Sequence, residues 1–259
     1  MKLTDAQQQA LADRLFESVR AGQGIDPPSN TLDYDFDDAY RVRRKLVDHL
    51  IAAGGRPKGH KIGFTSEAMQ KMYGMTGPDF GILLDNMFTP QDQPVRVSHL
   101  SNTRAEPELA FELSRPLEGK VTIEDVLAAT ARIWAAVEVI DSRVGAMKAK
   151  ANDSLADNAG AGWVILSETS MPPSALPLAD IMMRIDIDGT VQEAKSGDVM
   201  GHPAAPLAWL ANKLAPWGES LQAGQVVLAG SFTRPVAAKR GDRFDADYGP
   251  LGRFTFRFV

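Results

Sequence analysis

The stretch Arg104-Ala105-Glu106-Pro107-Glu108-Leu109-Ala110-Phe111 alternates charged and apolar side chains from Arg104 to Leu109. A period of two residues is typical of a β-strand, so Glu106 and Glu108 are predicted to project side by side from one face. Two neighbouring carboxylates repel each other unless a positive charge lies between them. On this pair alone, an exposed strand face in water is favoured over two ligands of a divalent metal.

A third carboxylate reverses that interpretation. Glu138 lies in the run Ala135-Ala136-Val137-Glu138-Val139-Ile140, which predicts a buried strand. A carboxylate there must be neutral, paired or metal-bound, and for Glu138 alone an ion pair with Arg104 or Arg143 explains it as well as a metal does. For the three glutamates together, a shared hard cation is the better explanation. No cysteine or histidine cluster accompanies them, which favours Mg²⁺ or Mn²⁺ over Zn²⁺.

The bulk properties indicate an ordinary globular protein. The chain has 259 residues, a hydrophobic content of 44% and a net charge of −5, with no cysteine. The missing cysteines exclude disulfides and a cysteine nucleophile. There is no basic run typical of nucleic-acid binding and no apolar run of membrane-spanning length. We therefore expect a cytoplasmic protein that binds neither nucleic acid nor a membrane.

Hydrophobic periodicity predicts helices in the first third and mainly strands after it. This indicates an α+β fold and one catalytic domain over 1–259, with a helix-rich part at 1–57 and a mainly β part at 58–259. Residues 141–162 contain few apolar anchors and are predicted to form a mobile or ligand-ordered loop. Predicted helices cover 4–21, 37–53, a short segment after Ser66, 122–133 and 203–214. Predicted strands cover 58–65, 79–85, 95–99, 104–113, 135–140, 163–166, a hairpin at 182–195, 226–230, 235–238, 243–248 and 253–259.

Three further places carry candidate functional residues, each with a structural explanation beside the functional one. Lys61 either is an exposed lysine, which its spacing alone favours, or meets a substrate carboxylate near the metal. Its neighbour His60 either packs in the core or acts as an acid–base group. Asp157 and Asn158 either form a capped turn or close over a ligand. Thr233, in Gly230–Pro235, lies either in a tight turn or in an anion-binding loop. No Walker, GxGxxG, HExxH or GxSxG motif supports nucleotide, nicotinamide or serine-hydrolase chemistry.

A series of ordered motifs carries a family likeness over about 38–259. Together they resemble the group of 2-hydroxypentadienoate hydratases and 4-oxalocrotonate decarboxylases within the fumarylacetoacetate hydrolase superfamily. GHKIG, SFTRPV and the tail from Trp209 are most similar to the 2-oxohept-4-ene-1,7-dioate hydratases of that group. The motifs are GHKIGFTSEAMQ, PDFGILLDNMF, RAEPELAFEL, VEVIDSR, ADNAGAG, MGHP, WLANKLA and LAGSFTRP.

The resemblance implies a mixed β-roll around a metal site, with helices outside it and at the N-terminus. It implies Mg²⁺, with Mn²⁺ as the alternative, as the cofactor. One motif departs from the family pattern, because Gly160 stands where the family has a serine, so any hydroxyl role there is lost. The implied metal ligands are Glu106, Glu108 and Glu138. The implied catalytic residues are Lys61, Asp79, Asp157 and Glu106, and the implied substrate-binding residues are His60, Thr233, Arg234 and Asn158.

The implied activity is the addition of water to a 2-hydroxy-dienoate or its 2-oxo tautomer in the meta-cleavage breakdown of aromatic compounds. The alternatives are a 4-oxalocrotonate-type decarboxylase, hydrolytic cleavage of an acylpyruvate, and a catalytically silent partner subunit. The resemblance also implies a homo-oligomer and a complex with a decarboxylase or hydratase of the same pathway. The three carboxylates, with Lys61 intact, argue against the silent subunit.

Overall fold

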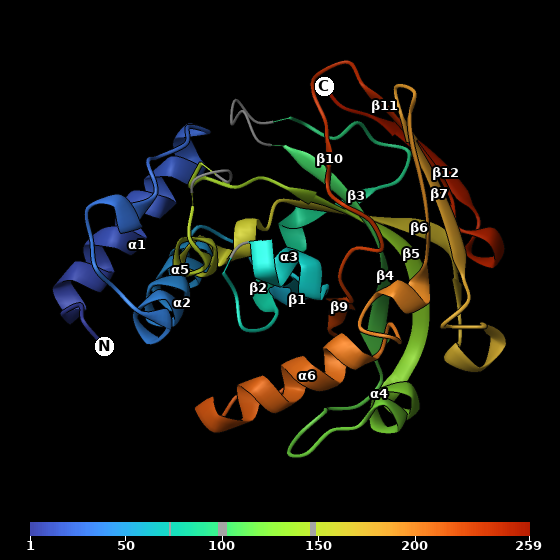
Figure 1. Cartoon of the computed structure of the whole chain (residues 1–259), viewed down its shortest axis with the longest axis horizontal. Coiled ribbons are helices and arrows are strands. Elements are labelled where there is room, and N and C mark those ends of the chain that lie inside the picture. Colours follow the sequence, from blue (N-terminus) through green and yellow to red (C-terminus); the bar gives the residue numbers. More distant parts are fainter. Residues whose placement is uncertain (73, 98–102, 146–148) are drawn as a thin grey trace.

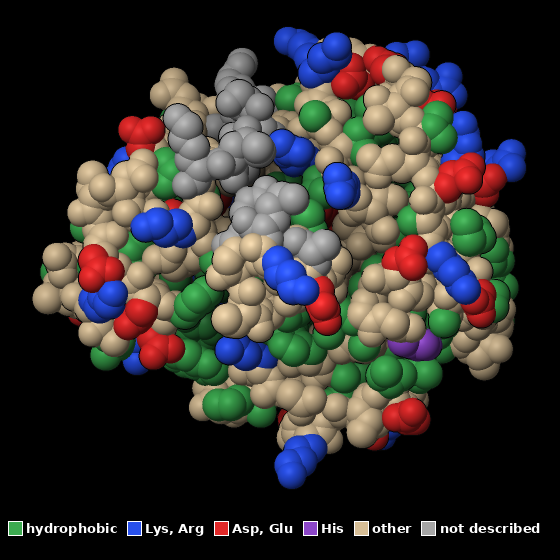
Figure 2. Space-filling view, viewed as in Figure 1, with side chains coloured by type: hydrophobic (Ala, Val, Ile, Leu, Met, Phe, Trp, Pro, Cys, Tyr) green, Lys and Arg blue, Asp and Glu red, His purple; other side chains and the backbone are tan. Residues whose placement is uncertain are grey.

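A computed structural model describes residues 1–72, 74–97, 103–145 and 149–259. The N-terminal helices lie at one end of the molecule and the curved β structure at the other (Figure 1). On the face shown in Figure 2, acidic and basic side chains are interspersed. Among the helices of these residues, none is long and apolar enough to cross a membrane.

Helices α1 (Asp5–Ala21) and α2 (Phe36–Ala52) confirm the two helices predicted for the N-terminal part. Each begins with a capping box, formed by Thr4 with Gln7 and by Asp35 with Asp38, so the first free backbone amides are bonded. The apolar stripes of the two helices are buried against each other and the core. Helix α2 also packs on α5, so the N-terminal part contacts the element next to the cleft described below.

The larger sheet is mixed and contains eight of the described strands. Seven run in the order β2-β1-β9-β4-β5-β6-β3, and β10 pairs with β4. The pairs β1–β9 and β3–β6 are parallel and the other pairs antiparallel. The strands are β1 (Pro57–Gly63), β2 (Asp79–Leu84), β3 (Phe88–Pro90), β4 (Arg104–Leu113), β5 (Thr130–Ile140), β6 (Trp163–Met171), β9 (Val226–Leu228) and β10 (Val236–Ala237).

The smaller sheet has the order β12-β11-β7-β8 among the described strands. It contains the predicted hairpin, in which Asp188 and Gly189 form the turn at positive φ. Tyr248, which follows β11, connects this region to the larger sheet, because its hydroxyl donates to the carbonyl of Ala136 at 2.6 Å. The strands are β7 (Met182–Ile187), β8 (Thr190–Lys195), β11 (Arg243–Asp247) and β12 (Arg253–Arg257).

The remaining helices of the described residues are shorter, and short 3₁₀ turns join many of the elements. Helix α6 confirms the predicted helix near 203–214 and packs its apolar side on the core. The helices are α3 (Glu67–Met72), α4 (Ile123–Ala129), α5 (Ala151–Ala156) and α6 (Ala205–Leu214). The 3₁₀ turns are Pro28–Asn30, Asp85–Met87, Asn158–Gly160, Pro173–Ala175, Ser196–Asp198, Ala215–Trp217 and Gly249–Leu251.

The structure corrects three expectations about local structure. The helix predicted over 122–133 ends at Ala129, and β5 begins at Thr130, whose hydroxyl bonds back to Val126. The segment predicted as a loop over 141–162 contains α5 and a 3₁₀ turn, and its residues 146–148 lie outside the described residues. In the strand expected at 95–99, Val95 makes a single bridge to Phe258, and residues 98–99 lie outside the described residues.

Candidate active site

Strands β4 and β5 bring the three glutamates together. Glu106 and Glu108 project from the same face of β4, and Glu138 stands directly opposite Glu106 in the antiparallel register. One carboxylate oxygen of each lies within 4.8 Å of the others. Like charges directly opposite each other destabilise a sheet, so this register needs a compensating positive charge or bound protons.

The environment of these carboxylates differs from the exposed strand face that the Glu106–Glu108 pair alone suggested. Glu106 is 9% exposed, and Glu108 and Glu138 are fully buried. The backbone amide of Gly230 donates to Glu108 Oε2 at 2.7 Å. Among the described residues, Glu108 Oε1 and both oxygens of Glu138 have no hydrogen-bond partner. Lys61 Nζ lies 3.3 Å from Glu138 Oε2 as an ion-pair partner. Buried carboxylate oxygens that lie within 4.8 Å of one another and accept few hydrogen bonds fit a hard cation such as Mg²⁺ or Mn²⁺.

The pKa values of the three glutamates are raised, because burial disfavours their charged forms and nearby positive charge does not fully offset that effect. Burial raises the pKa of Glu106 to about 8, with Lys61 opposing the rise and Glu138 adding to it. Burial and then the charge of Glu138 hold the pKa of Glu108 well above its usual range. Burial also raises the pKa of Glu138, although Lys61 opposes it. Without a cation, the cluster therefore retains protons that exposed glutamates lose near pH 4.5.

Lys61 supplies positive charge from β1. Its Nζ lies 3.3 Å from Glu138 Oε2, and the side chain is 3% exposed, so the ordinary exposed lysine is excluded. Burial alone would lower the pKa of Lys61, but Glu138, Asp79 and Glu106 together raise it, so the amine stays charged. Glu138 is thus paired with Lys61, whereas Arg143 is paired with Asp157.

Asp79 begins β2 directly opposite Gly63 of β1. A Cβ on Gly63 would lie 2.4 Å from Asp79 Oδ1 and 3.3 Å from Lys61 Nζ, so glycine is the residue that leaves room for both charged groups. Burial raises the pKa of Asp79, whereas Lys61 and a hydrogen bond from Ser154 lower it. A carboxylate with such opposing influences beside a buried amine is a candidate acid–base group.

Part of this group of residues lines a cleft of about 550 Å³. Lys61, Asp79 and Glu106 contribute to its wall, as do Thr233 and Arg234 from the segment after β9. Gly160, the residue that replaces the family serine, also lines the cleft at φ +67°. A Cβ there would lie 3.0 Å from Ile140 Cγ2, so this turn has little room for a side chain. The cleft therefore joins a carboxylate cluster, a buried lysine and an exposed arginine.

Asp157 and Asn158 lie outside the cleft lining. Asp157 is fully buried and accepts from Arg143 Nε at 2.6 Å and from the Arg143 backbone amide at 2.8 Å. Burial raises the pKa of Asp157 to about 6, although Arg143 opposes the rise. The Asn158 side chain bonds both the amide and the carbonyl of Ile82, each at 2.8 Å. Both residues thus anchor the turn beside the cleft, and their contacts give no support to an acid–base or substrate-binding role.

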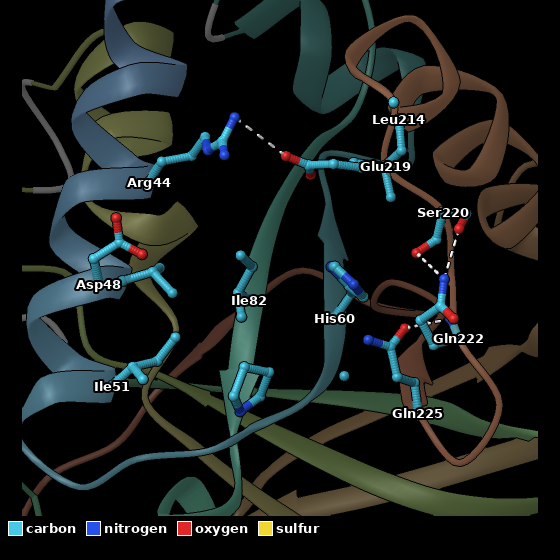
Figure 3. A pocket seen from close by; sticks show the side chains of 14 residues that line it. Arg44, Asp48, Ile51, His60, Ile82, Leu214, Glu219, Ser220, Gln222 and Gln225 are labelled. Carbon is cyan, nitrogen blue, oxygen red and sulfur yellow. Dashed lines mark hydrogen bonds and ion pairs between the residues drawn. The ribbon is translucent and has the colours of Figure 1, made fainter.

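His60 faces the opposite side of β1 from Lys61 and lines a second cavity of about 390 Å³ (Figure 3). Arg44 of α2 and Glu219 approach to 3.6 Å across one end of that cavity. Burial, with the charge of Arg43 adding to it, lowers the pKa of His60 to about 3, so the imidazole is neutral. The structure does not bring His60 together with the other predicted substrate-binding residues.

Sequence reasoning missed Ser154, and it predicted an anion-binding loop at Gly230 without identifying Glu108 as the carboxylate that the Gly230 amide bonds. Ser154 lies on α5, in the segment predicted as a loop, and its hydroxyl donates to Asp79 Oδ2 at 3.0 Å. Nothing in the local pattern marks it, because its partner is far away in the chain. The Gly230 signal was a glycine directly after an apolar strand, which predicted an anion-binding loop, and the amide of Gly230 does bond a carboxylate of the protein itself.

Comparisons with known proteins agree with the family likeness. No protein-family model matches the chain. The chain is 41% identical to 2-oxo-hept-4-ene-1,7-dioate hydratase of Escherichia coli, covering 98% of this chain and 96% of the relative. It is 38% identical to 2-hydroxyhexa-2,4-dienoate hydratase of Comamonas testosteroni, covering 95% of each chain. The structure matches 4-oxalocrotonate decarboxylase of Pseudomonas putida G7, complexed with magnesium and adipate, with a TM-score of 0.95, 30% identity and 99% coverage of both chains. These findings confirm the predicted family and the predicted α+β fold.

Proposed function

The chain belongs to the hydratase and decarboxylase group of the fumarylacetoacetate hydrolase superfamily, and from that premise we propose that it is a Mg²⁺-dependent hydro-lyase. The proposed substrate is a 2-hydroxy-dienoate or its 2-oxo-alkenoate tautomer from the meta-cleavage breakdown of aromatic compounds, with 2-oxohept-4-ene-1,7-dioate as the first choice. The observation that carries the proposal is the buried cluster of three carboxylates, of which Glu106 lines one cleft together with Lys61 and Asp79.

Glu106, Glu108 and Glu138 are the proposed ligands of the cation. Bound Mg²⁺ would supply positive charge where negative charge builds up on the substrate carboxylate and 2-oxygen. Lys61 is proposed to hold the substrate carboxylate and to help move protons, since it is buried and charged. Asp79 is proposed as the acid–base group, with Glu106 as a second candidate because it also lines the cleft.

In the proposed reaction, Asp79 is the group that accepts a proton from the substrate. It takes the proton of the 2-hydroxyl group, and a proton is returned to C5 of the dienol. The remaining double bond then lies between C3 and C4, in conjugation with the C2 carbonyl. Water adds its hydroxyl at C4 and its proton at C3, which gives a 4-hydroxy-2-oxo acid. Asp79 is suited to such exchange because its Oδ1 is buried and has no hydrogen-bond partner among the described residues.

A decarboxylase is the second candidate function. The observation that favours it is the close structural match to 4-oxalocrotonate decarboxylase. Loss of CO₂ from a vinylogous 3-oxo acid needs the same stabilisation of negative charge at the 2-oxygen. The three glutamates and Lys61 would thus serve both reactions.

One experiment separates the two. The dienol is generated in solution, the purified protein is added with Mg²⁺, and the loss of ultraviolet absorbance is followed together with CO₂ release. We expect absorbance loss without CO₂, abolished by EDTA. Release of CO₂ would replace the hydratase by the decarboxylase, and no turnover of any dienol would indicate a silent partner subunit.

The length of the substrate can be tested through Arg234. This exposed arginine lines the cleft with Thr233 and is proposed to bind a second carboxylate at the far end of a diacid. Arg234→Met should raise KM for 2-hydroxyhepta-2,4-diene-1,7-dioate up to about fivefold and leave KM for 2-hydroxypenta-2,4-dienoate unchanged. Arg240→Met is the matched control, since Arg240 is exposed outside the cleft lining. Equal effects on both substrates would contradict the diacid assignment.

We also propose that the protein forms a homo-oligomer in the cytoplasm, which associates with a decarboxylase or hydratase of the same pathway. The support is family membership. Light scattering of the purified protein, alone and with the candidate partner, measures both assemblies. A monomer under all conditions would exclude them.

A further inference from the structure

Ser154 is the residue of α5 that reaches the proposed acid–base group. It is half-buried, lines the cleft, and donates its hydroxyl proton to Asp79 Oδ2 at 3.0 Å. The other oxygen, Oδ1, is buried and has no hydrogen-bond partner within the described part of the chain. Oδ1 is also the oxygen next to Gly63, on the side of Lys61. The two oxygens of Asp79 therefore have different environments, and Ser154 is the side chain that bonds one of them.

Helix α5 has six residues, too few to be stable alone, but it is held at both ends by buried carboxylates. At its N-terminal part, Asp153 accepts from the Ser29 amide at 2.9 Å, the Ser29 hydroxyl at 2.6 Å and the Tyr34 hydroxyl at 2.6 Å. At its C-terminal end, Asp157 is bound by Arg143. Ser154 lies between these two anchors, so the position of its hydroxyl is fixed by contacts remote from the cleft.

We infer that Ser154 is a positioning residue for Asp79: by bonding Oδ2, it fixes the carboxylate so that Oδ1 is the oxygen that exchanges the proton with the substrate. This inference rests on the proposed acid–base role of Asp79. A hydroxyl that donates to a carboxylate also favours the ionised form. Ser154 thus keeps Asp79 ready to accept a proton at a pH where burial alone would leave it protonated.

Other charged groups face Asp79 and have to remain constant in a test. They come from several of the surrounding elements, and replacing Ser154 by alanine changes none of them. They are Lys61 on β1, Arg43 on α2, Glu106 on β4 and Glu138 on β5.

The test is the pH profile of kcat/KM for the wild-type protein and the variants, with Mg²⁺ saturating. Ser154→Ala should move the acid limb upward by about one pH unit, a tenfold change in the acid dissociation constant. Ser154→Thr keeps a hydroxyl and should return the limb to the wild-type position. Asn152→Ala is the structural control, because Asn152 lies on the same helix and its side chain bonds the Tyr34 carbonyl at 2.8 Å. It should leave the limb in place.

The inference is overturned if the acid limb of Ser154→Ala stays at the wild-type pH, if Ser154→Thr behaves like alanine, or if Asn152→Ala moves the limb equally. Asp79→Asn separates this failure from failure of the proposed function. If Asp79→Asn abolishes turnover and Ser154→Ala has a wild-type profile, the role of Ser154 alone is wrong. If Asp79→Asn retains wild-type turnover, both the acid–base assignment and the inference built on it are wrong.

Discussion

Raising the pH from 6.5 to 8 should destabilise the metal-free protein, because Glu106 must lose a proton in the folded state. Burial raises the pKa of Glu106 from 4.5 to about 8, with Glu138 and Asp79 adding to the rise and Lys61 opposing it. In this interval an unfolded chain has already ionised Glu106, so the folded state binds more protons and stability falls as pH rises. For this one group, the linkage relation gives a loss of about 1.5 kcal/mol across the interval. The raised pKa values of Glu108 and Glu138 act in the same direction.

The choice of this pH interval reduces the contributions of two other buried groups to the pH dependence of stability. The pKa of His60 is lowered by burial from 6.5 to about 3, so its contribution to stability grows mainly as pH rises to 6.5 and levels off about one pH unit above it. Burial raises the pKa of Asp157 from 3.8 to about 6, so its contribution falls with pH mainly below 6. Between 6.5 and 8, the carboxylate cluster therefore dominates the pH dependence.

The assay is urea unfolding, followed by circular dichroism, at several pH values with EDTA or with Mg²⁺. Glu106→Gln should reduce the slope seen in EDTA, because it removes one of the titrating groups of the cluster. Since a cation binds the ionised carboxylates, the stabilisation by Mg²⁺ should increase with pH and flatten the slope. Equal stability of the EDTA-treated protein at pH 6.5 and pH 8, or an unchanged slope in Glu106→Gln, would refute the reasoning.

Three further changes test individual contacts. Glu138→Gln should abolish Mg²⁺ binding in calorimetry while circular dichroism stays native, because it removes one of three ligands; retained affinity would mean that Glu138 only pairs with Lys61. Asp157→Asn should lower the free energy of unfolding in urea by about 3 kcal/mol, because it leaves Arg143 as a buried charge without its partner; an unchanged midpoint would contradict the ion pair. Lys61→Met should reduce kcat about a hundredfold yet keep or tighten Mg²⁺ binding, because it removes a cation beside the cluster; weaker binding in calorimetry would show that Lys61 supports the metal site.

Local patterns were sufficient to predict which glutamates share a face. Alternation placed Glu106 and Glu108 on one side of a strand, and the apolar neighbours of Glu138 predicted its burial, because both properties depend on residues next to each other in the chain. The partner of Glu138 could not be predicted this way. Lys61 reaches it because β1, β9, β4 and β5 lie in one curved sheet, and strand order is decided by contacts between distant segments.

The segment 141–162 shows a different limit. Hydrophobic periodicity detects elements that are held by apolar faces, but α5 is held largely by Asp153 and Asp157, whose partners Ser29, Tyr34 and Arg143 supply buried hydrogen bonds. Without knowledge of those partners, a conspicuous carboxylate such as Asp157 resembles an acid–base group. In the structure its lone pairs are occupied by Arg143, which is why geometry favours Asp79 for that role.

The charge of the cleft also implies an order of events. Four buried carboxylates, those of Glu106, Glu108, Glu138 and Asp79, face the buried amine of Lys61. If the carboxylates are ionised, an incoming substrate carboxylate is repelled, and if they hold protons, Lys61 is the buried group that attracts it. A dication held by the three glutamates, as proposed, would remove the repulsion and release their protons. Under that proposal, substrate affinity and cation affinity would be coupled, because the glutamates proposed to bind the cation would otherwise oppose the substrate.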